Sequence, residues 1–333
     1  MIRKTKTQYR RTFLGQSGLT LGSLLLASNS QLRAGGIFRR EREAFQISLA
    51  QWTLVRELKS GKIDNLDFAK VASDHGIGAI EYVNQFFMDK ATDKNYLAEM
   101  KKRADDLSVT SVLIMCDNEG NLGDPDESKR KTAVENHRKW IDAANALGCH
   151  AIRVNARSGG SWDEQVKLAA DGLRSLCEIG EQENIHVIVE NHGGLSSNAD
   201  WLLEVMETVN HSKCGTLPDT GNFRINNEET YDSYLGVKKL MPWAKGVSIK
   251  DKVWDANGNQ SDLDFTRMMQ IVVNAGYRGH CGIEFGGLEG LNAARESLEI
   301  ARDQIELPRS EKPIADAIDR LRPRRKSNRR SES

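Results

Sequence analysis

Short apolar runs alternate along the chain with stretches of helical periodicity. The apolar runs predict eight strands, at 45–54, 77–83, 109–115, 150–154, 185–190, 215–219, 245–249 and 280–284. In each segment that follows a strand, apolar residues recur three or four positions apart, as on one face of a helix. The run 185–190 reads I-H-V-I-V-E, which suits a strand buried on both faces, as parallel sheets require.

The local signals at the ends of the predicted helices support this division. Glycine follows the predicted helix ends at Gly76, Gly148 and Gly276, and Ser161 with Glu164 forms a capping-box pattern at a helix start. Eight strand-helix units over about 260 residues are the usual size of a (β/α)8 barrel. A doubly wound open sheet also alternates strands and helices, but no G-x-G-x-x-G follows the first predicted strand. The predicted fold class is therefore α/β, a single (β/α)8 TIM barrel over 45–305.

Polar and charged residues stand at the ends of the predicted strands. In a (β/α)8 barrel these ends converge on one mouth, which would collect Glu81, Glu190, Asp219, Lys250, Asp251 and Glu284. Several carboxylates in one mouth repel one another unless a cation or shared protons offset their charge. A divalent metal is the simplest solution, and oxygen-rich ligation favours Mg²⁺ or Mn²⁺ over Zn²⁺.

Four of these strand ends, V-E-N-H-G-G, P-D-T-G-N, V-S-I-K-D and I-E-F, occur in an order that resembles the sugar phosphate isomerase/epimerase family, which has a xylose-isomerase-like barrel. In that family a glutamate, an aspartate, a histidine and a second glutamate hold one divalent ion. The resemblance therefore implies Glu190, Asp219 and Glu284 as metal ligands, with Ser248 at the histidine position. It implies Mn²⁺ or Mg²⁺ as the cofactor, with Co²⁺ an alternative.

The sequence departs from the family pattern at two positions. Ser248 offers a neutral, weak hydroxyl where the family has an imidazole, so a water would complete the metal shell or the affinity would fall. His192 is an alternative metal ligand, although a substrate contact is the favoured interpretation. Asn222 stands where a second family histidine often occurs; it can hydrogen-bond a substrate hydroxyl but cannot transfer a proton.

The chemistry that the resemblance implies is proton transfer next to the carbonyl of a ketose or another sugar derivative. Glu190 and Glu284 are the candidate catalytic pair, one taking the proton and the other returning it. Lys250 would stabilise the developing oxyanion or, with equal weight, pair with Asp219 or Glu284 for structure. Glu81 would contact the substrate or hydrogen-bond behind the site. Arg153 and Asn155 are interpreted as structural.

Two other functions stay open. A non-catalytic sugar- or polyol-binding barrel is suggested by Ser248 in place of histidine, and it would bind a ligand without forming product. The second alternative is a metal-dependent hydrolase or lyase that acts on a sugar derivative, which agrees with the predicted location outside the cytoplasm, where phosphorylated sugars are scarce. In each case the partner is a small-molecule carbohydrate, and a homo-oligomer is compatible with the sequence.

Charge and the chain ends add a predicted location. The formal net charge is zero, but residues 1–34 carry six basic residues and no acid, so the remainder is mildly acidic, which argues against nucleic-acid binding. Arg10-Arg11 before an apolar run resembles a twin-arginine (Tat) export signal, which implies a periplasmic or extracytoplasmic protein. The run is too short for a stable membrane span. The basic tail 306–333 is expected to be disordered, and the five cysteines are expected to be buried or free. Trp52 could line a pocket, but a place in the core is the favoured interpretation.

Overall fold

Eight parallel strands form the central sheet of the computed structural model, which describes residues 44–307. Their order in the sheet is β6-β5-β4-β3-β2-β1-β10-β7, and two bridges, Thr216 to Ala244 and Asp219 to Ser248, bring the β6 and β7 edges together into a nearly closed barrel. The TIM-barrel prediction is confirmed. The strands are β1 (Gln46–Ala50), β2 (Ala79–Val83), β3 (Thr110–Met115), β4 (Ala151–Val154), β5 (His186–Glu190), β6 (Cys214–Leu217), β7 (Val247–Ile249) and β10 (His280–Ile283).

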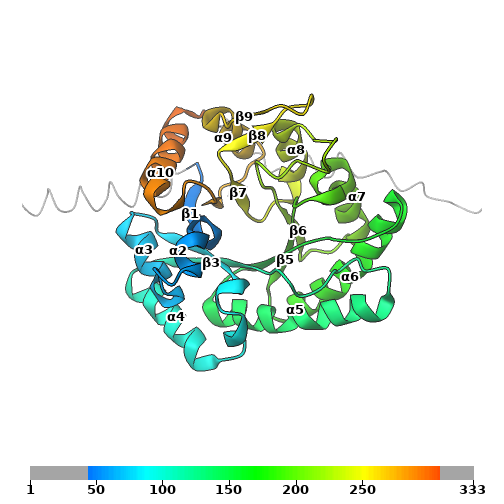
Figure 1. Ribbon diagram of the computed structural model, residues 1–333, viewed down its shortest axis with the longest axis horizontal. Helices are drawn as coiled ribbons and strands as arrows, with labels where there is room; N and C mark the ends of the chain where they lie inside the picture. Colours follow the sequence, from blue (N-terminus) through cyan, green and yellow to red (C-terminus); the bar gives the residue numbers. More distant parts are fainter. Residues whose placement is uncertain (1–43, 308–333) are drawn as a thin grey trace, which may run out of the picture. The chain divides into compact units, whose positions relative to one another are not determined.

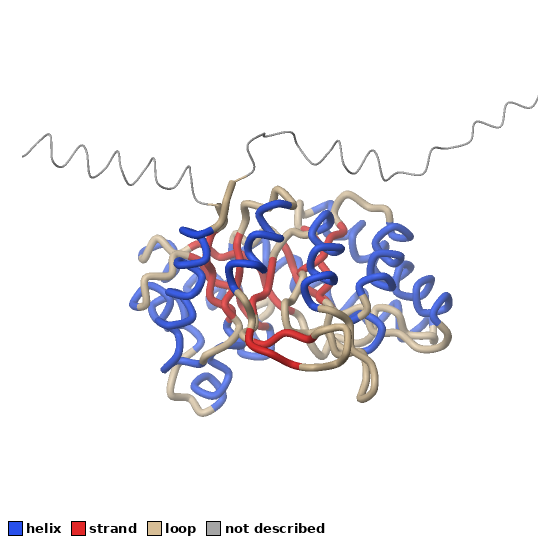
Figure 2. The backbone as a smooth tube through the Cα atoms, turned by 90° about the horizontal axis from the view of Figure 1, so that it is seen from above, coloured by secondary structure: helices blue, strands red, loops and turns tan. Residues whose placement is uncertain are grey.

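Helices surround the strands on the outside, as the views along and across the barrel show (Figures 1 and 2). The α-helices are α2 (Val55–Lys59), α3 (Phe68–Asp74), α4 (Lys94–Asp106), α5 (Glu127–Leu147), α6 (Trp162–Gln182), α7 (Ala199–Val209), α8 (Ser233–Leu240), α9 (Phe265–Asn274) and α10 (Gly287–Gln304). Short 3-10 turns are η1 (Gln51–Leu54), η2 (Asn65–Asp67), η3 (Asn84–Phe86), η4 (Met88–Lys90), η5 (Gly194–Ser197) and η6 (Met241–Trp243).

Helix ends follow the local sequence signals. Ser161 and Glu164 form the expected capping box, in which each side chain bonds the other residue's backbone N–H at the start of α6. Helix α5 ends at Leu147, and the next residue, Gly148, has a left-handed φ of 78°, which suits glycine. These local interactions mark the ends of the two long helices, whose buried faces pack against the core.

The structure differs from the sequence prediction at the end of the first strand and in an additional hairpin. The first strand ends at Ala50 instead of running to 54, because the chain turns there into η1. Helix α8 begins at Ser233, where Asp232 caps it, and the segment before it pairs Arg224 with Thr230. An antiparallel hairpin, β8 (Lys252–Trp254) with β9 (Gln260–Asp262), follows β7 and was not expected.

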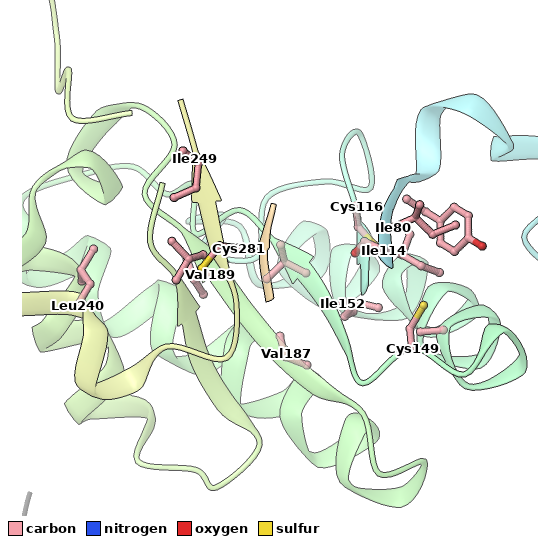
Figure 3. Close-up of a cluster of buried hydrophobic side chains, with 14 of the residues drawn as sticks. Ile80, Ile114, Cys116, Cys149, Ile152, Val187, Val189, Leu240, Ile249 and Cys281 are labelled. Carbon is pink, nitrogen blue, oxygen red and sulfur yellow. Dashed lines mark hydrogen bonds between the residues drawn. The ribbon is translucent and has the colours of Figure 1, made fainter. Parts of the chain in front are cut away.

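Alternate strand residues pack into two hydrophobic clusters. The smaller cluster contains Leu113, Ile188 and Leu217, whereas the neighbours Val187 and Val189 of Ile188 belong to the larger one. This alternation is what a strand covered on both faces requires. Figure 3 shows part of the larger cluster, to which β2 to β5 contribute Ile80, Ile114, Ile152 and Val187. All five cysteines are buried free thiols, as the sequence indicated.

The predictions for the two chain ends fall largely outside the described residues. The twin-arginine segment 1–34 lies there entirely, and so does 308–333 of the basic tail. Among the helices of residues 44–307, none has both the length and the apolar character needed to cross a bilayer.

Two histidines at the starts of strands predict acid sensitivity. Burial lowers the pKa of His186, beside Lys245 and Lys213, and of His280, near His150, to about 4 in both cases. In the unfolded chain both histidines take up a proton near the ordinary histidine pKa of about 6.5. The stability that the two neutral histidines contribute is therefore complete above this pH and is lost as the pH falls towards 4. We expect urea unfolding to show a smaller loss of stability between pH 6.5 and 4.5 in His186→Gln and His280→Gln than in the wild type. His75→Gln, at a partly exposed position, is the control; equal acid slopes in all four proteins would contradict the prediction.

Candidate active site

Three carboxylates meet at the C-terminal ends of strands that are distant in sequence. Glu190 is the last residue of β5, Asp219 lies two residues beyond β6, and Glu284 follows β10 directly. One oxygen from each lies within 4.8 Å of the other two. The parallel topology of the barrel therefore places three of the predicted metal ligands in one group.

Asp219 is held rigidly by its surroundings. Its Oδ1 accepts the backbone N–H groups of Gly221 and Asn222, both at 2.8 Å, and its Oδ2 lies 2.8 Å from the Ser248 hydroxyl. The side chain of Asn191 bonds both the backbone N–H and the carbonyl of Asp219. Burial raises the pKa of Asp219 to about 7; Lys250 opposes the shift, and the neighbouring glutamates add to it.

Glu190 is fixed through both of its oxygens. The Asn222 amide donates a hydrogen bond to Oε1 at 2.9 Å. Arg153 Nε forms an ion pair with Oε2 at 2.8 Å, but the Nε–H group does not point at that oxygen and makes no hydrogen bond to it. Arg153 Nη1 donates to Asp117 Oδ1 at 2.8 Å, which also accepts from Asn155. Burial raises the pKa of Glu190, although the guanidinium of Arg153 opposes the shift. Asn222 therefore positions Glu190 in this structure.

Ser248 and Lys250 connect the other two carboxylates. The Ser248 Oγ lies 2.8 Å from Asp219 Oδ2 and 2.8 Å from Glu284 Oε2. The Lys250 ammonium contacts Glu284 Oε1 and lies 3.7 Å from Asp219 Oδ2. Burial by itself would lower the pKa of Lys250, but the charges of Asp219, Glu284 and Glu190 outweigh it and raise the pKa. The structure thus contains the pairing of Lys250 with Asp219 and Glu284 that the sequence left open.

Glu81 lies beneath the site and has no exposed surface. Its Oε1 accepts a hydrogen bond of 2.6 Å from Ser48, and a Cβ on the neighbouring Gly282 would approach its Oε2 to 2.5 Å. Burial raises the pKa of Glu81 to about 8, with further increases from the charges of Glu284 and Glu190. Because the side chain is fully buried and bonded to Ser48, the structure favours a role behind the site over a direct substrate contact.

A cavity of about 440 Å³ opens beside Glu284, one of the three carboxylates. Its wall includes Trp52, Asp117, Arg153, His192 and Glu284. Trp52 is partly buried and packs against the smaller hydrophobic cluster, so its place is the pocket wall and not the core interior that the sequence favoured. His192 is turned so that its buried Nδ1 has no protein partner among residues 44–307. Burial lowers the pKa of His192, and the charge of Arg153 lowers it further. Among the described residues, the group of potential metal ligands consists of Glu190, Asp219 and Glu284 and does not include His192.

Sequence reasoning missed part of this wall. Asp117 lies two residues beyond β3, as Asp219 lies two residues beyond β6, so the rule that selected the other carboxylates would have found it. Arg153, interpreted as structural, touches Glu190 and lines the cavity. Asp251, by contrast, was expected in the mouth but is exposed and lies outside the carboxylate group.

The three carboxylates fit a hard divalent cation. They supply oxygen donors close enough to share one ion, which is the ligation that Mg²⁺ and Mn²⁺ prefer. Ser248 can add only a neutral hydroxyl. The site is therefore an acidic cluster that could bind a metal ion without the imidazole expected from the family.

A family model described as "Xylose isomerase-like TIM barrel" matches residues 69–306. The chain belongs to this family. That assignment confirms the resemblance seen in the strand-end motifs, and it agrees with the barrel and with the carboxylates at its mouth.

Individual relatives of the family are more distant. Inosose dehydratase 1 of Bacillus cereus is 29% identical over 90 residues, which are 27% of this chain and 29% of that protein. The structure is similar to that of D-psicose 3-epimerase with D-tagatose from Clostridium cellulolyticum H10, with a TM-score of 0.61, 13% identity and coverage of 79% of this chain and 100% of the other. A xylose isomerase-like TIM barrel protein from Mycobacterium smegmatis in complex with magnesium gives a TM-score of 0.59, 15% identity, and coverage of 78% and 96%. At these identities the two structures establish the fold alone.

Proposed function

We propose that this protein is a sugar-modifying enzyme that moves a proton at the carbon next to the carbonyl of a ketose or keto-sugar derivative. The observation that carries the proposal is the convergence of Glu190, Asp219 and Glu284 beside a cavity of about 440 Å³. Membership in the xylose isomerase-like family and a solved relative that holds D-tagatose support a carbohydrate as the ligand. The predicted export through residues 1–34 would place this activity outside the cytoplasm.

In this proposal two carboxylates of the protein carry out the proton transfer. Glu190, oriented by Asn222 and Arg153, takes the proton from carbon, and Glu284 at the end of β10 returns it or passes it to an oxygen. Arg153 and Lys250 place positive charge beside these two groups. His192 and Asn155 line the cavity and offer hydrogen bonds that would orient sugar hydroxyls.

Glu190, Asp219 and Glu284 would hold a divalent cation, with Mn²⁺ or Mg²⁺ the proposed metal. When bound, such an ion supplies positive charge that offsets the negative charge developing on the sugar oxygens as the proton leaves. The magnesium in the Mycobacterium smegmatis structure supports this assignment.

A lyase is the second candidate, favoured by the stretch of 90 residues that is similar to an inosose dehydratase. Loss of water from a keto sugar begins with the same proton abstraction, and the two outcomes differ in whether the proton returns to carbon or a neighbouring hydroxyl departs. Incubation of the full chain with ketoses and keto-cyclitols in D₂O, followed by NMR, tests both. Deuterium at the carbon next to the carbonyl supports the proposal, and a new double bond identifies the lyase; no exchange with any of these compounds would contradict it.

The proposed cation predicts a binding stoichiometry. We expect electron paramagnetic resonance of free Mn²⁺ to show one ion bound per wild-type chain when Mn²⁺ is in excess, because one group of three carboxylates converges among the described residues. Glu190→Gln and Asp219→Asn remove one anionic oxygen ligand each and should abolish the binding. Asp251→Asn, at an exposed position in the loop after β7, is the control. Equal Mn²⁺ binding by all four proteins would show that the ion sits elsewhere.

A further inference from the structure

Lys250 reaches into the carboxylate group from the loop that follows β7. Its ammonium contacts Glu284 Oε1 and lies 3.7 Å from Asp219 Oδ2, with the lysine side chain 22% exposed and the two carboxylates 6% and 0% exposed. These partners are two of the three residues that would hold a divalent cation. A lysine with solvent nearby has therefore turned inward towards buried anions.

The loops after β6 and β7 leave room for the Lys250 side chain. The Lys250 backbone N–H donates to Thr220 Oγ1 at 2.8 Å, which ties the loop after β7 to the loop after β6. Gly221 faces the stem of Lys250, since a Cβ at position 221 would come within 2.8 Å of Lys250 Cβ and 2.9 Å of Cγ. A larger residue at position 221 would displace the lysine side chain. The loops after β6 and β7 together therefore allow Lys250 to point inward.

An ammonium and a divalent cation cannot both occupy this position at low cost. An ion bound to Asp219 Oδ2 at the usual distance of about 2.1 Å would lie at most about 6 Å from the ammonium nitrogen. Like charges this close and largely removed from water repel strongly. In addition, Ser248 lies 2.8 Å from oxygens of both carboxylates and supplies no imidazole that would strengthen ion binding.

We propose that Lys250 is the built-in cation of this site and competes with a divalent ion for Asp219 and Glu284. Binding of the ion requires the ammonium to leave these carboxylates and move towards the cavity that Glu284 also lines. The site then has two forms, one neutralised by the lysine and one by the ion. This inference rests on the cation site of the proposed function and adds a residue that sets its affinity.

The full chain and its Lys250→Gln variant, titrated with Mn²⁺ and followed by electron paramagnetic resonance, test the competition. Removing the ammonium should lower the Kd for Mn²⁺ by about 10- to 100-fold, the size of effect that residues next to metal ligands commonly have. Lys252→Gln is the matched control, because Lys252 lies two residues further on and pairs with Asp262 in the exposed hairpin. It should leave the Kd unchanged. A Kd for Lys250→Gln equal to or above that of the wild type, or no Mn²⁺ binding by either protein, would overturn the inference.

A second variant guards against a change in folding. Lys250→Cys should bind Mn²⁺ tightly, and alkylation of the new thiol with 2-bromoethylamine, which rebuilds an ammonium of nearly the same reach, should return the Kd to the wild-type value. The native cysteines are buried and would react slowly. An unchanged Kd after alkylation contradicts the competition. These titrations use no sugar, so a failure of the proposed chemistry would appear only in the D₂O experiment and can be told apart.

Discussion

Replacing Glu190 by glutamine is expected to slow deuterium exchange at the carbon next to the carbonyl by about 10²- to 10⁴-fold, the usual contribution of a positioned general base. The amide keeps the shape of the side chain but cannot accept a proton. Its position at the end of β5, with Asn222 on one oxygen and Arg153 on the other, leaves little freedom to compensate. NMR in D₂O with the wild type and Glu190→Gln at equal concentration measures the effect.

The control for this prediction is Glu207→Gln, an exposed glutamate on α7 that should exchange at the wild-type rate. Exchange by Glu190→Gln within about twofold of the wild type would remove Glu190 from the proton transfer and leave Glu284 as the candidate base. A sugar that binds both proteins with equal affinity, without exchange in either, would favour the non-catalytic binding barrel that Ser248 suggested.

Replacing Arg153 by methionine is expected to cost about 3–5 kcal/mol of unfolding free energy, the usual result of removing one partner from a buried ion pair. Arg153 is 5% exposed and bonds Asp117 while its Nε lies 2.8 Å from Glu190 Oε2. Methionine fills much of the volume but leaves both carboxylates without their cation. Equilibrium urea unfolding measured at neutral pH gives the difference directly.

Two further proteins make this test specific. Arg138→Met removes an exposed arginine that pairs with Glu135 on α5, and it should change the stability by about 1 kcal/mol or less. Adding Glu190→Gln to Arg153→Met removes one of the two uncompensated charges and should recover part of the loss. If Arg153→Met is as stable as Arg138→Met, the buried ion pair does not stabilise the fold.

Much of the site was predictable because the barrel topology is simple. Once 185–190 and the other apolar runs are assigned as parallel strands, Glu190, Asp219 and Glu284 must meet at one end, whatever the details of packing. The sequence alone also shows that a serine, Ser248, stands at the position where the family has a histidine, because this depends only on residue type. Capping residues such as Ser161 act within a few positions, so their effect was also visible in advance.

The remaining features depend on side-chain direction and on pairs of residues that lie far apart in the sequence. Arg153 is 37 positions from Glu190, and no local pattern says that it points inward to that carboxylate. Lys250 could equally have faced water, but in the folded chain its stem packs against Gly221 and its ammonium pairs with Asp219 and Glu284. The turn after Ala50 likewise moved Trp52 from the expected core into the cavity wall. Hydrophobic periodicity and strand-end chemistry therefore determined the barrel and its three carboxylates, because both are properties of short segments. The cations that neutralise them were decided by tertiary packing, because only the folded chain sets which charged groups lose water together.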